Sequence, residues 1–211
     1  GQIQRALEKY IDNDEYGYRK VFFIAAPTGA GKTTMIEQTV FTRASKETKI
    51  LYVSSRVAIN VQVKRRLLQA ANSAGEPERY TDAGIMKTET LGDITVLTYA
   101  GLYRKMISGV KLENEYEIVC FDEPQALYTD ATFSGYTGFV LDNLRGVFAS
   151  SKKICLTATP DDILPLLAER FNDYQVHVYK LKTMNDYVNL FLFHNENCVI
   201  GEIKSDKTEN K

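Results

Sequence analysis

Short apolar runs alternate along this chain with longer segments whose apolar residues recur at helical spacing. The apolar runs predict strands at 21–27, 49–56, 93–99, 116–123, 152–159 and 175–181. The other segments predict helices at 2–12, 33–47, 57–73, 100–109, 131–151 and 161–171. Strands that are apolar throughout and alternate with helices are typical of a parallel sheet covered on both faces. We therefore predict an α/β fold with a doubly wound, mostly parallel sheet.

The C-terminal end has a different pattern. Residues 187–194 and 199–205 predict two strands joined by a polar turn, and the charged residues that follow predict a disordered tail. This divides the chain into a main domain over 1–183, a β-hairpin appendage or linker over 184–205, and a tail over 206–211.

Composition narrows the class of protein. At 211 residues, with 44% hydrophobic and 25% charged residues, the chain is an ordinary globular domain, and it lacks an apolar run long enough to span a membrane. We expect no membrane partner and a monomer. Three cysteines in apolar runs suit a reducing compartment, so we expect a cytoplasmic protein. The net charge of -1 provides no overall attraction for nucleic acid. The chain starts with Gly1 rather than Met, which suggests a piece of a longer protein.

Residues 26–33, APTGAGKT, match the phosphate-binding loop pattern with Ala in place of its first Gly. The loop lies between a predicted buried strand and a predicted helix, which is the context that the pattern requires. Its glycines permit a tight curve whose amides point at phosphate oxygens, next to the positive end of the helix dipole. We predict binding of ATP with Mg²⁺, with Lys32 at the β and γ phosphates and the Thr33 hydroxyl on Mg²⁺. The nucleotide-binding residues are Thr28, Gly29, Ala30, Gly31, Lys32, Thr33 and Thr34.

Two carboxylates end the strand predicted at 116–123. In open parallel sheets, ligands bind at the carboxyl ends of strands, so Asp122 and Glu123 are candidate catalytic residues. We predict that Asp122 holds Mg²⁺, mostly through water, and that Glu123 polarises the water that attacks the γ-phosphate. A solvated acidic strand end is the alternative. The phosphate loop earlier in the chain favours catalysis.

APTGAGKT, DEPQ at 122–125 and LTATP at 156–160 resemble, in this order, motifs I, II and III of the superfamily 2 DEAD/DEAH-type helicases. The resemblance covers residues 2–160 and implies the N-terminal RecA-like ATP-binding lobe of a P-loop motor that moves on nucleic acid, with DNA favoured over RNA. It also implies a second RecA-like lobe in the full-length chain. This chain alone is then expected to be nearly inactive as an ATPase, because that lobe supplies arginine fingers.

The same resemblance implies further roles. Gln4 is similar to the glutamine that reads the adenine edge. Residues 54–60, SSRVAIN, and 97–102, LTYAGL, resemble the segments that contact nucleic acid, through Ser55, Arg56 and Thr98. Thr157 and Thr159 are similar to the hydroxyls that couple ATP state to lobe movement. Gln125 stands where this family commonly has His or Asp, and it could hydrogen-bond motif III.

Two other functions stay open on the residues alone. One is a nucleotide-dependent switch or binding module, and the other is a P-loop ATPase that does not act on nucleic acid. His177 and His194 lie in apolar segments without ligand spacing, so we predict no zinc site. For the basic run at 64–66, we favour a solvated helix face over a surface that binds nucleic acid.

Overall fold

The structure is a computed structural model, and it describes residues 2–13, 20–44, 48–73, 82–129, 135–170, 175–181, 188–194 and 197–203. Over these residues nine strands form one sheet in the order β3-β4-β2-β5-β6-β1-β7-β8-β9. The strands are β1 (Lys20–Ala25), β2 (Ile50–Ser54), β3 (Thr90–Leu91), β4 (Ile94–Thr98), β5 (Ile118–Asp122), β6 (Lys152–Thr157), β7 (Gln175–Leu181), β8 (Val188–His194) and β9 (Asn197–Ile203).

The sheet is parallel from β4 through β2, β5, β6 and β1 to β7, and it is antiparallel only at its two ends. At one end β3 pairs antiparallel with β4, and at the other β8 and β9 continue antiparallel from β7. The expected mostly parallel α/β sheet is confirmed. Since β6 lies between β5 and β1, the carboxyl ends of these three strands are neighbours, which brings three distant segments of the chain together.

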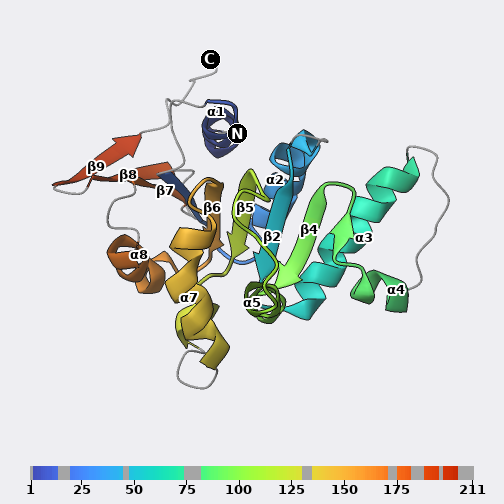
Figure 1. The fold of residues 1–211 in the computed structure, drawn as a ribbon. Coiled ribbons are helices and arrows are strands. Elements are labelled where there is room, and N and C mark those ends of the chain that lie inside the picture. The colour runs from blue at the N-terminus through green and yellow to red at the C-terminus, as the bar shows by residue number, and fades with distance from the viewer. Residues whose placement is uncertain are drawn as a thin grey trace, which may run out of the picture.

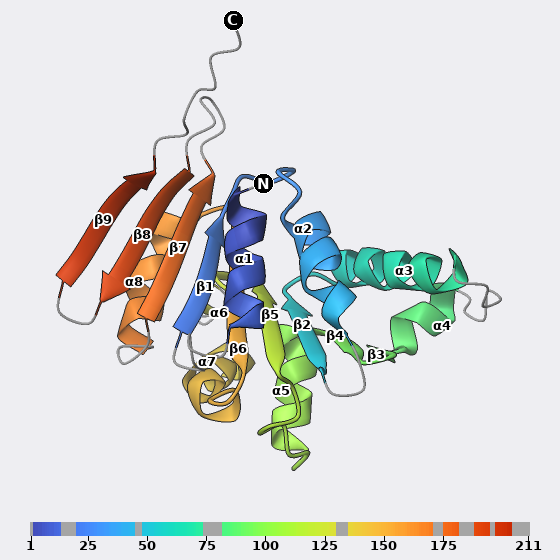
Figure 2. The ribbon, with the colours of Figure 1, turned by 90° about the horizontal axis from the view of Figure 1, so that it is seen from above.

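Helices cover both faces of the sheet (Figures 1 and 2). One apolar cluster joins the sheet to α1 (Gln2–Asp12), α2 (Lys32–Thr39) and α3 (Val57–Ser73). The other joins the opposite face to α5 (Tyr99–Ile107), α6 (Ala126–Thr129), α7 (Gly135–Val147) and α8 (Pro160–Arg170). Within β1, Phe22 belongs to the first cluster and Phe23 to the second, as the two-residue period of a strand requires. The apolar character of the strands therefore follows from burial on both faces.

Several helix boundaries differ from the sequence expectation. The helix expected over 33–47 ends at Thr39, and a 3₁₀ turn (Phe41–Arg43) follows it. This turn buries Phe41 edge-on against Tyr52 and lets Arg43 make a two-pronged ion pair with Asp12 of α1, at 2.9 and 3.0 Å. These tertiary contacts replace the further helical turns that the local pattern favours. The structure also has a short helix, α4 (Asp82–Lys87), in a part of the chain for which the sequence predicted neither a helix nor a strand.

At the C-terminal end, β8 and β9 fall where the sequence predicts two strands, and they extend the main sheet beyond β7. The division into a domain over 1–183, an appendage or linker over 184–205 and a tail stays a prediction. Residues 184–187, the turn at 195–196 and the tail from 204 lie outside the described residues. Among the described helices, none has the length and apolarity needed to cross a membrane.

Candidate functional site

The phosphate-loop segment connects β1 to α2 at the carboxyl edge of the sheet. Gly29 and Gly31 adopt φ angles of +82° and +79°, in the left-handed region that favours glycine. A Cβ added at either position would meet open space, so the backbone conformation alone requires glycine there. Among the described residues no side chain caps α2 at Gly31, which leaves the first amides of the helix for a ligand.

Not every amide of the loop faces outward. The Ala30 N–H donates to the Pro27 carbonyl at 3.1 Å, so contact between this amide and a phosphate requires that hydrogen bond to break. Thr28, Gly29 and Thr34 are exposed, and Thr33 is half-buried. The start of the loop is fixed to the neighbouring strand because the Ala26 N–H donates to the Thr157 carbonyl at 3.0 Å.

The Lys32 side chain extends back across the phosphate loop. Its Nζ donates to the carbonyls of Ala26 and Pro27 at 2.6 and 3.3 Å, and it lies 3.6 Å from Glu123 Oε1. The side chain is only 9% exposed, and the three partners of Nζ are all oxygen acceptors. The ammonium group therefore lies across the loop and already faces the carboxylate of Glu123, the residue directly after β5.

Asp122 is buried at the end of β5, and two tyrosines hold it. Tyr52 of β2 donates its hydroxyl to Asp122 Oδ2 at 2.7 Å, and Tyr99 of α5 donates to the Asp122 backbone carbonyl at 3.2 Å. Burial raises the pKa of Asp122, and the hydrogen bond from Tyr52 opposes this shift. Burial and the nearby Asp122 charge raise the pKa of Tyr52, so its phenol remains a donor.

Glu123 has a strained backbone, with φ at +51°, which is unusual for a residue that is not glycine. Its N–H donates to the Leu156 carbonyl at 2.8 Å, which fixes the turn against β6. Its carboxylate Oε2 accepts hydrogen bonds from the Ala158 N–H at 3.1 Å and from the Gln125 amide. One carboxylate oxygen is therefore anchored, and the other faces Lys32.

Gln125 joins this carboxylate to the segment after β6. Its Oε1 accepts a hydrogen bond from the Thr157 hydroxyl at 2.9 Å, while its Nε2 donates to Glu123. The contact expected between Gln125 and the LTATP segment is thus present in the structure. The Thr157 hydroxyl also accepts from the Thr159 N–H at 3.0 Å, so both threonines of this segment belong to one network.

The oxygen atoms at this site suit a hard cation. Tyr52 donates to the Asp122 carboxylate, and the nearby Thr33 side chain lowers the pKa of the same phenol, so Asp122 and Thr33 both lie close to Tyr52. Mg²⁺ is usually held by one or two protein oxygens together with phosphates and water, and this pair fits that requirement. Among the described side chains there is no cluster of three or more His, Cys, Asp or Glu residues that could hold a metal without a phosphate ligand.

The residues expected to contact nucleic acid lie at two other strand ends. Ser54, at the end of β2, donates to Asn60 Oδ1 at 2.7 Å and lies 3.1 Å from the Arg56 carbonyl. This holds the turn on which Ser55 is half-buried and Arg56 is exposed. Thr98 caps α5, because its hydroxyl accepts a hydrogen bond from the Gly101 N–H at 3.0 Å. Contact of these residues with nucleic acid stays a prediction.

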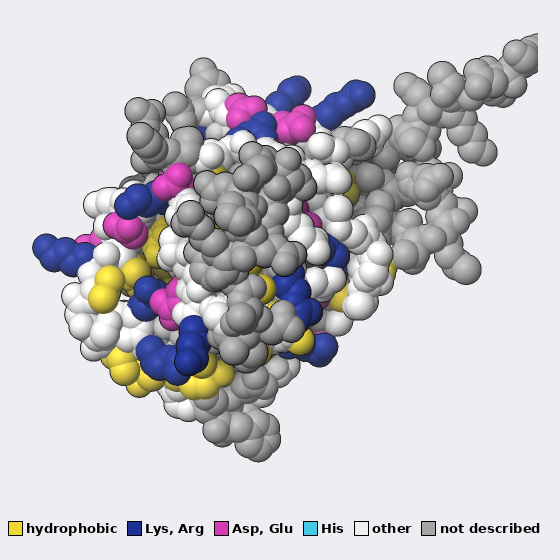
Figure 3. Space-filling view, turned by 90° about the vertical axis from the view of Figure 1, so that its right-hand side faces the viewer, with side chains coloured by type: hydrophobic (Ala, Val, Ile, Leu, Met, Phe, Trp, Pro, Cys, Tyr) yellow, Lys and Arg dark blue, Asp and Glu magenta, His cyan; other side chains and the backbone are white. Residues whose placement is uncertain are grey.

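The basic run at 64–66 does not form one exposed patch. Lys64 is buried, and Arg66 pairs with Glu37 of α2 at 3.1 Å. On the face drawn in Figure 3, Lys and Arg side chains are scattered among acidic and apolar ones.

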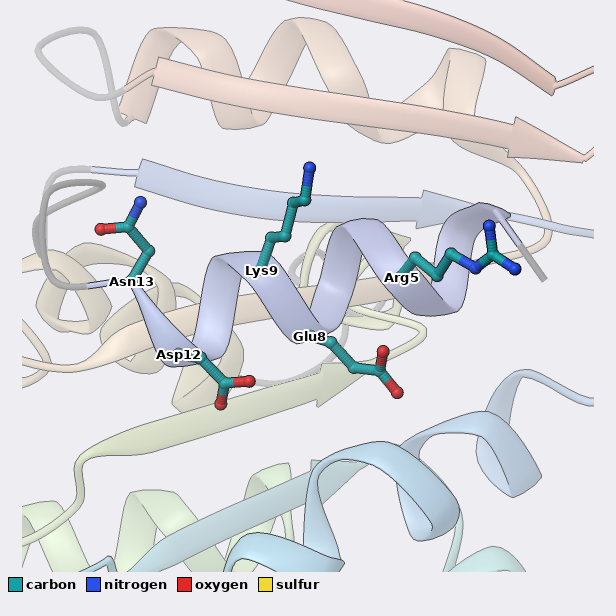
Figure 4. Close-up of a pocket in the computed structure, with 5 residues that line it drawn as sticks. All are labelled: Arg5, Glu8, Lys9, Asp12 and Asn13. Carbon is teal, nitrogen blue, oxygen red and sulfur yellow. The ribbon is translucent and has the colours of Figure 1, made fainter.

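A groove along α1 is separate from the phosphate loop. It is lined by Arg5, Glu8, Lys9, Asp12 and Asn13 (Figure 4). None of these lining residues belongs to the loop. Gln4, the residue expected to read adenine, donates from its amide to Glu8 Oε1 at 3.4 Å on the same helix, and its role with adenine stays a prediction.

Sequence reasoning did not single out the tyrosines of this site. Thirteen tyrosines are spread along the chain, and their spacing does not distinguish those that reach Asp122. The one local signal is a hydroxyl in the middle of a buried strand, at Tyr52 between Leu51 and Val53 in ILYVS. A buried hydroxyl needs a partner, and only the pairing of β2 with β5 shows which partner it has.

Comparisons with known proteins agree with this arrangement. A family model described as "Type III restriction enzyme, res subunit" matches residues 2–162. Among solved structures, the chain is similar to the Hef helicase domain of Pyrococcus furiosus, with a TM-score of 0.53 and 16% sequence identity. That similarity covers 85% of this chain but 38% of the Hef chain. A search of curated proteins finds no match.

Proposed function

This chain belongs to the family described as type III restriction enzyme, res subunit, and is a RecA-like ATP-binding lobe of the superfamily 2 helicase type; we propose that it binds ATP with Mg²⁺ and drives movement on DNA. The observation that carries the proposal is one network at the ends of β1, β5 and β6. Lys32 faces Glu123, and Glu123 is joined through Gln125 to Thr157. A nucleotide held by the loop would meet the catalytic and the coupling residues at once.

We assign the hydrolytic role to Glu123. Its Oε2 is anchored by two donors, so its Oε1 is the atom available to accept a proton from a water molecule. Lys32 exchanges the Ala26 and Pro27 carbonyls for phosphate oxygens when nucleotide binds, which releases Oε1 from the ammonium group. Mg²⁺, held by Thr33 and Asp122, would neutralise the phosphate charge that develops in the reaction.

Gln125, Thr157 and Thr159 provide the proposed coupling. Because Gln125 contacts both Glu123 and Thr157, a shift of either one moves the other. The segment after β6 lies at the same sheet edge, where a second lobe would close over the nucleotide. This chain spans 38% of the Hef chain, which leaves room for such a lobe in a longer protein.

We propose DNA as the polymer. The family is described as a subunit of a restriction enzyme, a class that acts on DNA, and this supports DNA over RNA. Ser55, Arg56 and Thr98 would contact its backbone, because they end β2 and β4 beside the nucleotide site. We also propose that the protein is cytoplasmic, because Cys120 and Cys155 are free thiols, which persist in a reducing environment.

Two measurements test the proposal. The first is binding of ADP and ATP to this chain, with Lys32→Ala as the control that removes the ammonium group. The second is ATP hydrolysis by the protein that carries both lobes, with single-stranded DNA, duplex DNA or RNA added, beside Glu123→Gln. Turnover that DNA stimulates and that both substitutions abolish is expected. Turnover unaffected by any nucleic acid would refute the motor and favour a switch module or an unrelated ATPase.

A further inference from the structure

Tyr52 places a hydroxyl in the middle of a buried strand, between the apolar residues Leu51 and Val53. It lies in β2, whose five residues are all buried, and the Tyr52 side chain is 0% exposed. Tyr52 pairs with Cys120 of β5, and Asp122 is two residues further along the same face. This is the face covered by α2, the helix on which Thr33 lies. The phenol therefore points along the sheet into the space between the helix start and the end of β5.

The tyrosine hydroxyl contacts one predicted magnesium residue and lies near the other. It donates to Asp122 Oδ2 at 2.7 Å, and the nearby Thr33 side chain lowers the pKa of its phenol. Its ring is held in place by an edge-on contact with Phe41, with ring centroids 5.9 Å apart. A ring fixed by packing fixes its hydroxyl, so Tyr52 sets where the Asp122 carboxylate lies beside the phosphate loop.

We propose that Tyr52 is a positioning residue for the Mg²⁺-bound nucleotide. By occupying Asp122 Oδ2, it leaves Oδ1 as the oxygen that faces the hydrated cation. Partners of this kind orient metal ligands, and their loss typically costs about 10- to 100-fold in metal affinity. This inference rests on the proposed function, because it requires that Thr33 and Asp122 hold Mg²⁺.

Tyr99 offers a matched control. It too is a buried tyrosine whose hydroxyl bonds to Asp122, but it donates to the backbone carbonyl at 3.2 Å and not to the carboxylate. Tyr52→Phe and Tyr99→Phe each remove one buried hydroxyl that contacts the same residue. A purely structural role would give the two variants the same phenotype.

The experiment measures binding of a fluorescent ADP analogue to this chain, in Mg²⁺ and in EDTA, for the unchanged protein and both variants. The readout is the ratio of the two affinities, which isolates the contribution of the cation from that of the phosphate loop. We expect Tyr52→Phe to lower this ratio by about tenfold or more, with unchanged affinity in EDTA. We expect Tyr99→Phe to leave the ratio unchanged. Thermal unfolding of both variants measures the loss of stability that follows from removing a buried hydroxyl.

The outcomes separate this inference from the proposed function. If the unchanged protein binds the analogue more tightly in Mg²⁺ and Tyr52→Phe keeps the same ratio, the positioning role is wrong while nucleotide binding stands. An equal fall for both variants would make the effect structural and would also overturn the role. A chain that binds no nucleotide, or binds it equally in Mg²⁺ and EDTA, would remove the basis of both.

Discussion

The burial of Lys153 lowers the free energy of unfolding, and a single substitution should raise it again. This lysine is the second residue of β6, its side chain is only 1% exposed, and its Nζ donates to the Ser151 carbonyl at 2.8 Å. Burial lowers its pKa from 10.5 to about 8, because the charged form loses its hydration. Lys153→Met keeps a long flexible side chain in the same space and removes the ammonium group.

The size of the effect follows from the two pKa values. A shift from 10.5 to about 8 corresponds to about 3 kcal/mol that opposes folding when the lysine is charged in both states. The substitution also leaves the Ser151 carbonyl without this donor, which costs about 1 kcal/mol. Lys153→Met should therefore raise the free energy of unfolding by about 2 kcal/mol near pH 7.

The pH dependence provides the sharper test. Between pH 8 and pH 10.5 the unfolded chain binds more protons at this lysine than the folded chain does, so the stability of the unchanged protein gains from this group as the pH rises. The advantage of Lys153→Met should thus fall from about 2 kcal/mol near pH 7 to below about 1 kcal/mol near pH 9.5.

Urea denaturation of both proteins at the two pH values measures this difference. Lys111→Met is the control, because Lys111 is exposed and its replacement should change stability by less than about 0.5 kcal/mol. A Lys153→Met protein that is less stable near pH 7, or whose advantage does not depend on pH, would refute the reasoning. It would show that the ammonium group gains more from its contacts than it loses in hydration.

Three further predictions concern the site. Gln125→Leu should lower ATP turnover by the two-lobed protein about tenfold and leave ADP affinity unchanged. Adding Thr157→Val should lower turnover no further, because both residues act through one hydrogen-bond chain. Additive losses in turnover would contradict this prediction. Gly31→Ala should weaken ADP binding, because Gly31 shapes the phosphate loop. It should lower the free energy of unfolding by only about 1–2 kcal/mol, because the added Cβ meets no atom and only the positive φ is penalised. An unchanged ADP affinity would contradict this prediction. Arg56→Ala should weaken DNA binding for all sequences alike and lower the salt dependence by about one unit, and an unchanged salt slope would exclude a phosphate contact.

Local pattern predicted the alternation of the main strands and helices, though not α4, β3 or α6, and it identified most residues of the candidate site. The phosphate loop is predictable because Gly29 and Gly31 are needed for their own φ angles, whatever surrounds them. Asp122 and Glu123 are predictable because Asp122 ends a buried strand and Glu123 directly follows it, and buried parallel strands carry ligands at their carboxyl ends. The early end of α2 at Thr39 was missed, because burial of Phe41 against Tyr52 outweighs the helical pattern there.

The sequence by itself determined which residue types could bind phosphate and cation, since those requirements lie within a few neighbouring residues. Only the tertiary structure decided how these residues meet. The placement of β6 between β1 and β5 puts Thr157 beside Gln125, and the pairing of β2 with β5 puts the Tyr52 hydroxyl on Asp122. Such contacts join residues 32 and 70 positions apart in the chain, and no local periodicity encodes them. They arise because the strand order that buries both faces of the sheet also fixes which polar groups must satisfy one another.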